Sequence, residues 1–234
     1  MSRIGIIGAM AEEVAMLVAR IENPVKSERT GMKFTEGILA GRDVVVVNSG
    51  IGKVNAALAV QVLADIFNVD YIVNTGVAGA ISNRLSIGDI VVSKDAMQHD
   101  MDSSYFGDPV GTIPRMKESF FKGDPKLIKL AEDVCKEVNP DINIFAGRIA
   151  SGDQFISSHE KKIWLAHTFD AMCVEMEGGA VAHAAYLNKI PFIIIRAISD
   201  KADGSATMDY MDFEKSAIKH TDRLLMGMLE KSAK

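Results

Sequence analysis

Short apolar runs rich in β-branched residues recur along the chain and predict its strands. They are continuous rather than alternating, as in strands that are buried on both faces. The isoleucines at positions 193–195 mark the clearest of them. We expect strands at residues 3–8, 33–39, 43–48, 71–74, 89–93, 142–150, 171–174 and 192–198.

Segments with apolar residues at helical spacing lie between these runs. We expect helices at residues 10–21, from 53 onward, and at 126–138, 161–167, 178–187 and 211–231. Strands that alternate with helices imply crossover connections, and hence an α/β domain with a largely parallel sheet. No repeat, low-complexity tract or linker divides the sequence, so we expect one domain over residues 1–234.

Residues 97–123 break this alternation. The segment carries Gly107, Pro109, Gly111 and Pro114 among aromatic residues. A long irregular segment inside a compact domain is uncommon and is often functional. A mobile surface excursion is the alternative, and the sequence leaves both open.

Composition narrows the functional class. The chain has 26 basic and 31 acidic residues, a net charge of −5, and 48% hydrophobic residues, which excludes general disorder. This mildly acidic balance argues against binding a nucleic acid backbone, and no apolar stretch approaches the ~20 residues of a membrane span. Glu12 and Glu13 interrupt the N-terminal apolar run, so we expect no secretory signal. Cys135 and Cys173 have no metal-binding spacing and are typical of reduced thiols in a cytoplasmic protein.

Glycine and carboxylate residues gather just after the predicted strands. In open α/β sheets, ligands bind at the carboxyl ends of the strands. The segments at these ends contain neither a dinucleotide-binding nor a P-loop pattern. Glu12 and Glu13 would repel an anion, so a neutral or cationic ligand with hydroxyl groups fits better than a phosphate. The segments are 8–13, 49–53, 75–79, 151–156, 175–177 and 196–200.

Each charged residue of these segments also has a purely structural interpretation. Glu13 suits the first turn of a helix. Glu175 and Glu177 face different sides of a helix start, so we expect at most one of them to enter a pocket. Asp200 leaves an apolar strand, where partial desolvation favours proton donation, although it also suits a helix N-cap. Arg196 is either a buried ion-pair partner or a ligand for hydroxyl groups.

Other candidates carry less weight. The sequence His-Asp-Met-Asp at 99–102 looks like a set of metal ligands, but adjacent residues on an extended loop rarely share one ion. We favour a network that braces the loop, and we expect no metal site. Phe155 is either a loop anchor or a platform for a ring. Met10 and Met176 stand out among the methionines because they adjoin the carboxylate clusters.

Six clusters taken together point to a known family. They are IIGAMAEE (6–13), SGIGKV (49–54), NTGVAG (74–79), SGDQFI (151–156), VEME (174–177) and RAISD (196–200). In order and spacing they resemble the bacterial 5′-methylthioadenosine/S-adenosylhomocysteine nucleosidases of the purine nucleoside phosphorylase superfamily. The resemblance runs from Ile4 to the C-terminal helix. It implies a single α/β domain with a mixed, partly barrel-like central sheet flanked by helices, a homodimer, and no cofactor.

The resemblance also implies catalytic roles. Glu13 would be the general base that activates water at the anomeric carbon. Asp200, held by Ser199, would donate a proton to N7 of adenine. Glu177 would accept hydrogen bonds from the ribose hydroxyls, and Arg196 would help to order the side from which water attacks.

Substrate-binding residues follow from the same resemblance. Phe155 would stack on adenine while the backbone of Ile156 reads the amino edge of the base. The residues expected around the 5′-thioalkyl group are Met10, Ile51 and Tyr210, with Phe106 and Pro114 of the neighbouring subunit. The remaining expected binding residues are Val77, Ala78, Gly79, Ser103, Glu175 and Met176.

Some positions depart from the family pattern. Val77 stands where the family commonly has serine beside the ribose. Ser103 and Gln154 replace small residues, and residues 108–110 are less aromatic than usual. These changes affect the fine arrangement of substrate and water.

The implied activity is hydrolysis of the N-glycosidic bond of methylthioadenosine and adenosylhomocysteine, extending to 5′-deoxyadenosine, in methionine salvage. An oxocarbenium-like transition state needs an acid at the leaving group and a base for water, which agrees with Glu13 and Asp200. A phosphorylase would need basic residues where Glu12 and Glu13 stand. A non-catalytic adenosine-binding module and a hydrolase of a modified futalosine are further rival functions. The sequence does not rank these substrates.

Overall fold

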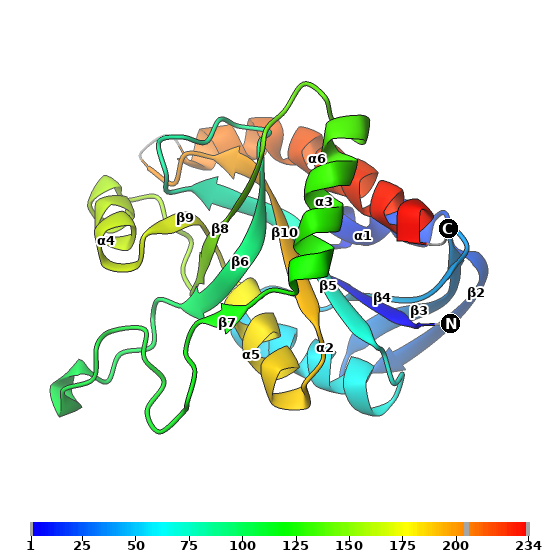
Figure 1. The fold of residues 1–234 in the computed structure, drawn as a ribbon, viewed down its shortest axis with the longest axis horizontal. Helices are drawn as coiled ribbons and strands as arrows, with labels where there is room; N and C mark the ends of the chain where they lie inside the picture. Colours follow the sequence, from blue (N-terminus) through cyan, green and yellow to red (C-terminus); the bar gives the residue numbers. More distant parts are fainter. Residues whose placement is uncertain (1, 204–205, 233–234) are drawn as a thin grey trace.

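The computed structural model describes residues 2–203 and 206–232 of the 234-residue chain (Figure 1). Strands and helices alternate along most of it. The strands are β1 (Ile4–Gly8), β2 (Glu22–Arg29), β3 (Met32–Leu39), β4 (Arg42–Asn48), β5 (Tyr71–Ala80), β6 (Ile90–Gln98), β7 (Phe121–Lys122), β8 (Ile144–Ser151), β9 (Ala171–Glu175) and β10 (Phe192–Asp200). The helices are α1 (Ala11–Val18), α2 (Lys53–Asp65), the short 3₁₀ turn η1 (Ser104–Phe106), α3 (Pro125–Val138), α4 (His159–Phe169), α5 (Gly178–Asn188) and α6 (Ala206–Ser232).

These strands form one mixed sheet that partly closes on itself. Their order is β10-β6-β8-β9-β5-β1-β4-β3-β2, and β10 also pairs with β5. Strands β5, β10, β6, β8 and β9 therefore form a closed ring, and β1 to β4 extend from it as an open sheet. The pairs β6–β10 and β5–β9 are antiparallel, whereas β1–β5 and β5–β10 are parallel. The mixed, partly barrel-like α/β fold is confirmed, and the largely parallel sheet expected from alternation alone is wrong.

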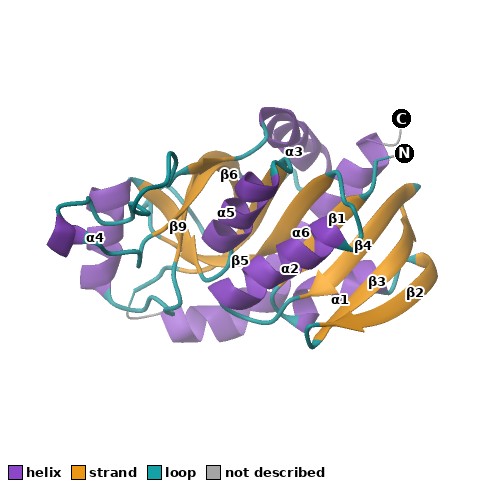
Figure 2. Ribbon diagram, turned by 90° about the horizontal axis from the view of Figure 1, so that it is seen from below, coloured by secondary structure: helices purple, strands orange, loops and turns teal. Residues whose placement is uncertain are grey.

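Helices cover both faces of the sheet. Helices α2 and α5 pack on one face, through small and aliphatic side chains such as Ala59, Leu63 and Val181. Helices α1, α3 and α6 pack on the other, through Leu17, Val134 and similar residues. Figure 2 shows α2 and α5 in front of the sheet. Every residue of β10 is buried, because the strand lies between these two layers.

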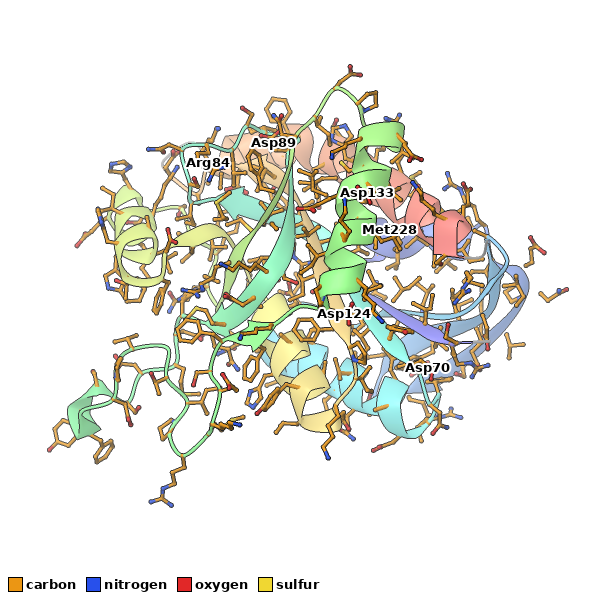
Figure 3. All side chains as sticks on the ribbon, viewed as in Figure 1. Asp70, Arg84, Asp89, Asp124, Asp133 and Met228 are labelled. Atoms are coloured by element: carbon orange, nitrogen blue, oxygen red, sulfur yellow. The ribbon has the colours of Figure 1, made fainter. Side chains whose placement is uncertain are left out.

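Local signals place the helix ends. Asp124 caps α3 by accepting hydrogen bonds from the backbone N–H groups of Lys126 (2.9 Å) and Leu127 (3.0 Å), and Pro125 follows it (Figure 3). Proline is favoured there because the first helical N–H has no partner within the helix. Ser158 caps α4 in the same way through the N–H of Lys161.

Two strands are longer than the sequence predicts. The glycine-containing segment 75–79 was expected after a strand, but it lies inside β5, which continues to Ala80. Residues 196–200 likewise belong to β10. Pairing between β5 and β10 carries both strands through these residues, up to Gly79 opposite Asp200. These two clusters therefore stand on strands rather than on loops.

The irregular segment forms an arm between β6 and β7. It extends away from the body of the molecule at the lower left of Figure 1 and carries η1 near its tip. Tyr105 and Phe106 on η1 are 93% and 83% exposed. In the described part of the chain, no helix is both long and apolar enough to cross a membrane.

Candidate active site

One cavity of about 370 Å³ lies where the ends of β1, β5, β9 and β10 meet. It unites residues from segments far apart in the sequence. Glu13 and Asp200 both border it. The lining residues are Ala9, Met10, Glu13, Ile51, Val77, Ala78, Gly79, Phe155, Val174, Glu175, Met176, Glu177, Ser199, Asp200 and Tyr210.

Glu13 lies in the first turn of α1, and its side chain turns back over the start of the helix. One carboxylate oxygen accepts hydrogen bonds from the backbone N–H groups of Ala9 (2.7 Å) and Met10 (3.0 Å). The other oxygen accepts one from Val77 (3.2 Å). Because Val77 contributes its backbone here, the contact does not depend on the side chain by which this sequence departs from the family pattern.

The environment of Glu13 favours proton uptake. Burial raises the pKa of its carboxyl, while the Arg196 guanidinium and the backbone N–H groups lower it in part. The result is a raised pKa in a side chain held in one orientation by its hydrogen bonds. A carboxylate in this state can accept a proton from a water molecule.

Asp200 ends β10 at an irregularity of the sheet. Ile198 pairs with Ala78 and Asp200 with Gly79, so Ser199 is an extra residue in β10, a β-bulge. Bulges redirect side chains, and both Ser199 and Asp200 border the cavity. The Asp200 carboxylate accepts hydrogen bonds from the Ser199 hydroxyl (2.9 Å) and the backbone N–H of Ala202 (2.8 Å).

Two glycines of β5 allow these acids to approach the strand. A Cβ atom at Gly76 would overlap a carboxylate oxygen of Glu13 and lie 3.2 Å from Nη1 of Arg196. A Cβ at Gly79 would lie 2.8 Å from Oδ1 of Asp200. Three residues of strand span ~10 Å, so the two glycines separate the places where the two acids approach β5.

Glu175 holds Arg196 in the interior behind the cavity. Its carboxylate accepts from Nη2 (2.5 Å) and Nε (3.2 Å) of Arg196, from the hydroxyl of Ser151, and from the backbone N–H groups of Glu177 and Gly178. Nη2 of Arg196 also donates to Oδ1 of Asn74 (2.6 Å). Arg196 is thus a buried ion-pair partner, the first of the two roles expected for it.

Glu177 also borders the cavity, and its carboxylate accepts fewer of the described hydrogen bonds than that of Glu175. Oε1 accepts a hydrogen bond from the backbone N–H of Gly52 (2.8 Å). Burial, together with the nearby carboxylates of Glu175 and Glu13, raises the pKa of Glu177 to about 7, although Arg196 opposes this. Both residues border the cavity, but the carboxylate of Glu175 is directed toward Arg196 behind it. This agrees with the expectation that at most one of Glu175 and Glu177 enters the pocket.

The opposite part of the cavity is mainly apolar. The Tyr210 hydroxyl lies 3.3 Å from Sδ of Met10 and donates to Oε1 of Glu214 (2.6 Å). The ring of Phe155 stands edge-on to Tyr210, with 6.1 Å between the ring centres. Ile51 is 55% exposed at the cavity mouth. Ile156 lines a small adjoining recess.

Three of the expected binding residues do not line the cavity of their own chain. Ser103, Phe106 and Pro114 are on the arm and do not border the cavity. The Ser103 hydroxyl instead donates to Asp108 (3.1 Å). Among the described residues, no group of three or more His, Cys, Asp or Glu side chains can hold a metal ion.

Sequence reasoning overlooked several partners of the site. Asn74 and Ser151 belong to the six sequence clusters. Their hydrogen bonds to Arg196 and Glu175 join distant strands, so the sequence did not reveal them. Glu214 had an available signal, since it lies four residues after Tyr210, which directly precedes the predicted helix 211–231, and side chains four apart on a helix meet.

Comparison with known proteins identifies the family. The model of the phosphorylase superfamily matches residues 3–230. A 5′-methylthioadenosine/S-adenosylhomocysteine nucleosidase of Staphylococcus haemolyticus is 40% identical over 228 residues, which cover 97% of this chain and 99% of the relative. The chain belongs to this nucleosidase family within the phosphorylase superfamily. It is therefore an N-glycosyl hydrolase.

Solved structures of nucleosidases share the fold. The family member from Colwellia psychrerythraea, in complex with adenine, has a TM-score of 0.93 and 38% identity, and the match covers 97% of this chain and 94% of that one. A futalosine hydrolase of Helicobacter pylori has a TM-score of 0.93 and 34% identity, with 98% of each chain covered. Likeness of fold therefore does not separate these two activities.

Proposed function

We propose that the protein hydrolyses the N-glycosidic bond of 5′-methylthioadenosine and S-adenosylhomocysteine, and also of 5′-deoxyadenosine, releasing adenine. The observation that carries this proposal is the position of Glu13 and Asp200 on one cavity, beside two glycines of the same strand. A cavity of about 370 Å³ is within the usual range for a small ligand. Its polar groups stand in an otherwise apolar lining, as in ligand sites that fix orientation with few contacts.

Asp200 acts as the general acid in this proposal. Its carboxyl protonates N7 of adenine, so that the base departs as a neutral molecule. Ser199 and the N–H of Ala202 hold the carboxyl in place. Protonation of a leaving group by a positioned acid typically contributes ~10²–10⁴-fold to the rate.

Glu13 acts as the general base on the sugar side. It draws a proton from water as the oxygen attacks the anomeric carbon, and the backbone N–H groups keep its carboxylate aimed at that oxygen. Arg196 lies behind this carboxylate and helps to order the attacking water. Glu177 accepts hydrogen bonds from the ribose hydroxyls, and its negative charge stabilises the positive charge that develops on the ring.

Phe155 and Ile156 form the adenine side of the proposed complex. Phe155 offers a half-exposed ring on which the base stacks, and the backbone of Ile156 contacts its amino edge. Met10, Ile51 and Tyr210 surround the 5′-alkylthio group at the apolar end of the cavity, and Met176 packs against the sugar.

Water is preferred over phosphate as the nucleophile. None of the described residues that line the cavity is lysine, arginine or histidine. Arg196, just behind the wall, is committed to Glu175 and Asn74. A phosphate dianion beside Glu13 and Glu177 would meet like charges without a compensating cation.

We also propose that the protein works as a homodimer in the cytoplasm, in methionine salvage. Phe106 and Pro114 on the arm then complete the 5′ pocket of the neighbouring subunit. In support, the arm extends away from the body of the molecule, and Tyr105 and Phe106 are almost fully exposed. Exposed Val54, Leu58 and Leu187 on α2 and α5 add an apolar surface of the kind that subunits bury.

The decisive assay supplies 5′-methylthioadenosine with and without phosphate. We expect adenine and free methylthioribose at equal rates in both. Formation of the sugar 1-phosphate would instead establish a phosphorylase, and binding without release of adenine would establish a non-catalytic module. A parallel reaction with a futalosine substrate compares the rate of that hydrolysis with the rate for methylthioadenosine, because both activities occur among the structural relatives.

A further inference from the structure

Two loops and the start of α2 are joined by a compact polar cluster of Lys53, Asp100 and Asp153. Nζ of Lys53 lies 2.6 Å from Oδ1 of Asp100. The other oxygen of Asp100 accepts the backbone N–H of Asp153 (3.0 Å). Oδ1 of Asp153 in turn accepts the backbone N–H of Lys53 (2.9 Å). The three contacts form a closed circuit between residues that lie 47, 53 and 100 positions apart in the sequence.

The circuit connects two segments that face the proposed substrate. Lys53 directly follows Gly52, whose N–H holds the carboxylate of Glu177 (2.8 Å). Asp153 stands two residues before Phe155, the proposed platform for adenine. Asp100 follows β6 and anchors both segments to the closed part of the sheet.

The segment carrying Phe155 also rests on a buried histidine. His99 is 1% exposed, and a Cβ at Gly152 would overlap its ring and lie 3.1 Å from Cγ of Asp100. The ring stands edge-on to Trp164, with 6.5 Å between centres. Glycine at 152 therefore lets the backbone lie directly on His99, so the segment is supported from behind as well as from the side.

Burial strengthens the ion pair of the cluster. The side chains of Lys53 and Asp100 are only 18% and 17% exposed, so solvent screens their attraction less than it screens a surface pair. Burial opposes the charge on Asp100, but the Lys53 ammonium and the Asp153 N–H outweigh it and hold the pKa of Asp100 below its ordinary value. Asp100 thus remains a charged acceptor at neutral pH.

We propose that Lys53, Asp100 and Asp153 form a positioning cluster that holds the adenine-binding segment 152–156 in place and thereby sets the affinity of the enzyme for the base. The three contacts join its members to one another rather than to Glu13 or Asp200. Loss of the cluster therefore weakens binding of substrate and transition state alike, which raises KM and leaves kcat nearly unchanged. This inference rests on the proposed function, because it assumes that Phe155 receives adenine.

The test compares Asp100→Ala and Asp153→Ala with the wild-type enzyme. We expect each substitution to raise KM for methylthioadenosine by about 10-fold, with kcat within about two-fold. Adenine binding measured by calorimetry should weaken by the same factor, and this readout does not depend on turnover.

A conservative variant separates positioning from simple loss of charge. Asp153→Asn retains an oxygen that can accept the N–H of Lys53, so we expect KM and adenine affinity close to the wild-type values. The matched control is Asp133→Asn on α3, away from the arm and α4 (Figure 3). It breaks an ion pair with Lys129 that has the same 2.6 Å distance, and we expect no change in KM.

The outcomes distinguish this proposal from the proposed function. Unchanged adenine affinity in both alanine variants, or an Asp153→Asn variant as impaired as Asp153→Ala, would overturn the positioning role. If Asp100→Ala does not fold, the comparison of Asp153→Ala with Asp153→Asn still decides the question, because Asp153 is exposed. A wild-type protein that neither binds adenine nor cleaves methylthioadenosine would overturn the proposed function, and the positioning role with it.

Discussion

The two catalytic candidates are both carboxylates, but their surroundings suit opposite tasks. Glu13 is surrounded by backbone N–H donors, which stabilise a charged acceptor ready to take a proton. Asp200 accepts from a hydroxyl and from one N–H, and a protonated carboxyl can keep both contacts while it donates its own proton. Residue type alone therefore does not separate the proposed base from the proposed acid, and their surroundings have to.

Replacing Asp200 with asparagine tests its role as the acid. The amide oxygen can still accept the N–H of Ala202, and the amide nitrogen can donate to the hydroxyl of Ser199, so we expect a folded protein with nearly unchanged melting temperature. The amide has no acidic proton, so kcat for methylthioadenosine should fall by about 10²–10⁴-fold. A variant that keeps near-normal turnover would show that another group protonates the base.

Glu177 offers a test by pH dependence of stability. Its pKa is about 7 in the folded protein, above the ordinary 4.5, so the folded state binds the proton more tightly than the unfolded state. The free energy of unfolding therefore falls as pH rises from about 4.5 through about 7. Glu177→Gln removes the charge and keeps an acceptor for the N–H of Gly52.

We expect Glu177→Gln to stabilise the ligand-free protein by on the order of 3 kcal/mol at about pH 8, and by much less at about pH 5. Melting temperatures at both values measure the difference. Turnover should fall at the same time, because the ribose hydroxyls lose a charged acceptor. Equal effects on stability at the two pH values would contradict the raised pKa.

Strand β5 is the element that brings the site together. It pairs with β1, β9 and β10, and its glycines accommodate Glu13 on one side and Asp200 on the other. Glycine weakens a strand interior, but it also marks places where another group approaches the backbone closely. The cost of two glycines in a buried strand is therefore tied to the position of the proposed catalytic pair.

Alanine at Gly76 tests this interpretation. The added methyl group would displace the carboxylate of Glu13, because they cannot occupy the same space. We expect kcat to fall by about 10²-fold or more, since small displacements of a reacting group are costly. Val73→Ala on the same strand is the control, because it should lower the melting temperature while kcat stays near the wild-type value. Similar kinetics for the two variants would contradict a specific role for Gly76.

At the scale of elements, the sequence predicts the buried parts best. The expected strand at 33–39 and the helix at 126–138 agree closely with β3 and α3. Strand β2 was not expected, because almost all its residues are exposed and it contains Pro24. It forms by pairing with β3. Neither the apolar pattern nor the composition of β2 indicates this pairing.

For the molecule as a whole, closure of the barrel was not predictable from periodicity. It depends on β10 pairing with β5 and β6 together, and such non-local pairings leave no local pattern. The motifs at 6–13 and 196–200 predicted that Glu13 and Asp200 meet at one site, and both border one cavity. The resemblance supplied this prediction, which spacing alone did not. The cluster around Asp100 was expected only as a loop brace, and its connection to the site required the coordinates.

The arm provides the test of assembly. If Phe106 completes the pocket of the neighbouring subunit, Phe106→Ala should lower kcat/KM for methylthioadenosine by about 10-fold, because a large apolar contact with the 5′ group is lost. The melting temperature should hardly change, since the side chain is 83% exposed in its own chain. The effect on 5′-deoxyadenosine, which has a smaller 5′ group, should be weaker.

A mixed dimer shows whether the phenylalanine acts across the interface. One subunit carries Phe106→Ala and the other Asp200→Asn, with different affinity tags so that the heterodimer can be purified. In the subunit that retains Asp200, the pocket then receives an intact Phe106 from its neighbour, so we expect roughly half the wild-type activity per dimer. If Phe106 served its own subunit, neither site would be complete, and the heterodimer would be no more active than an equal mixture of the two parent homodimers.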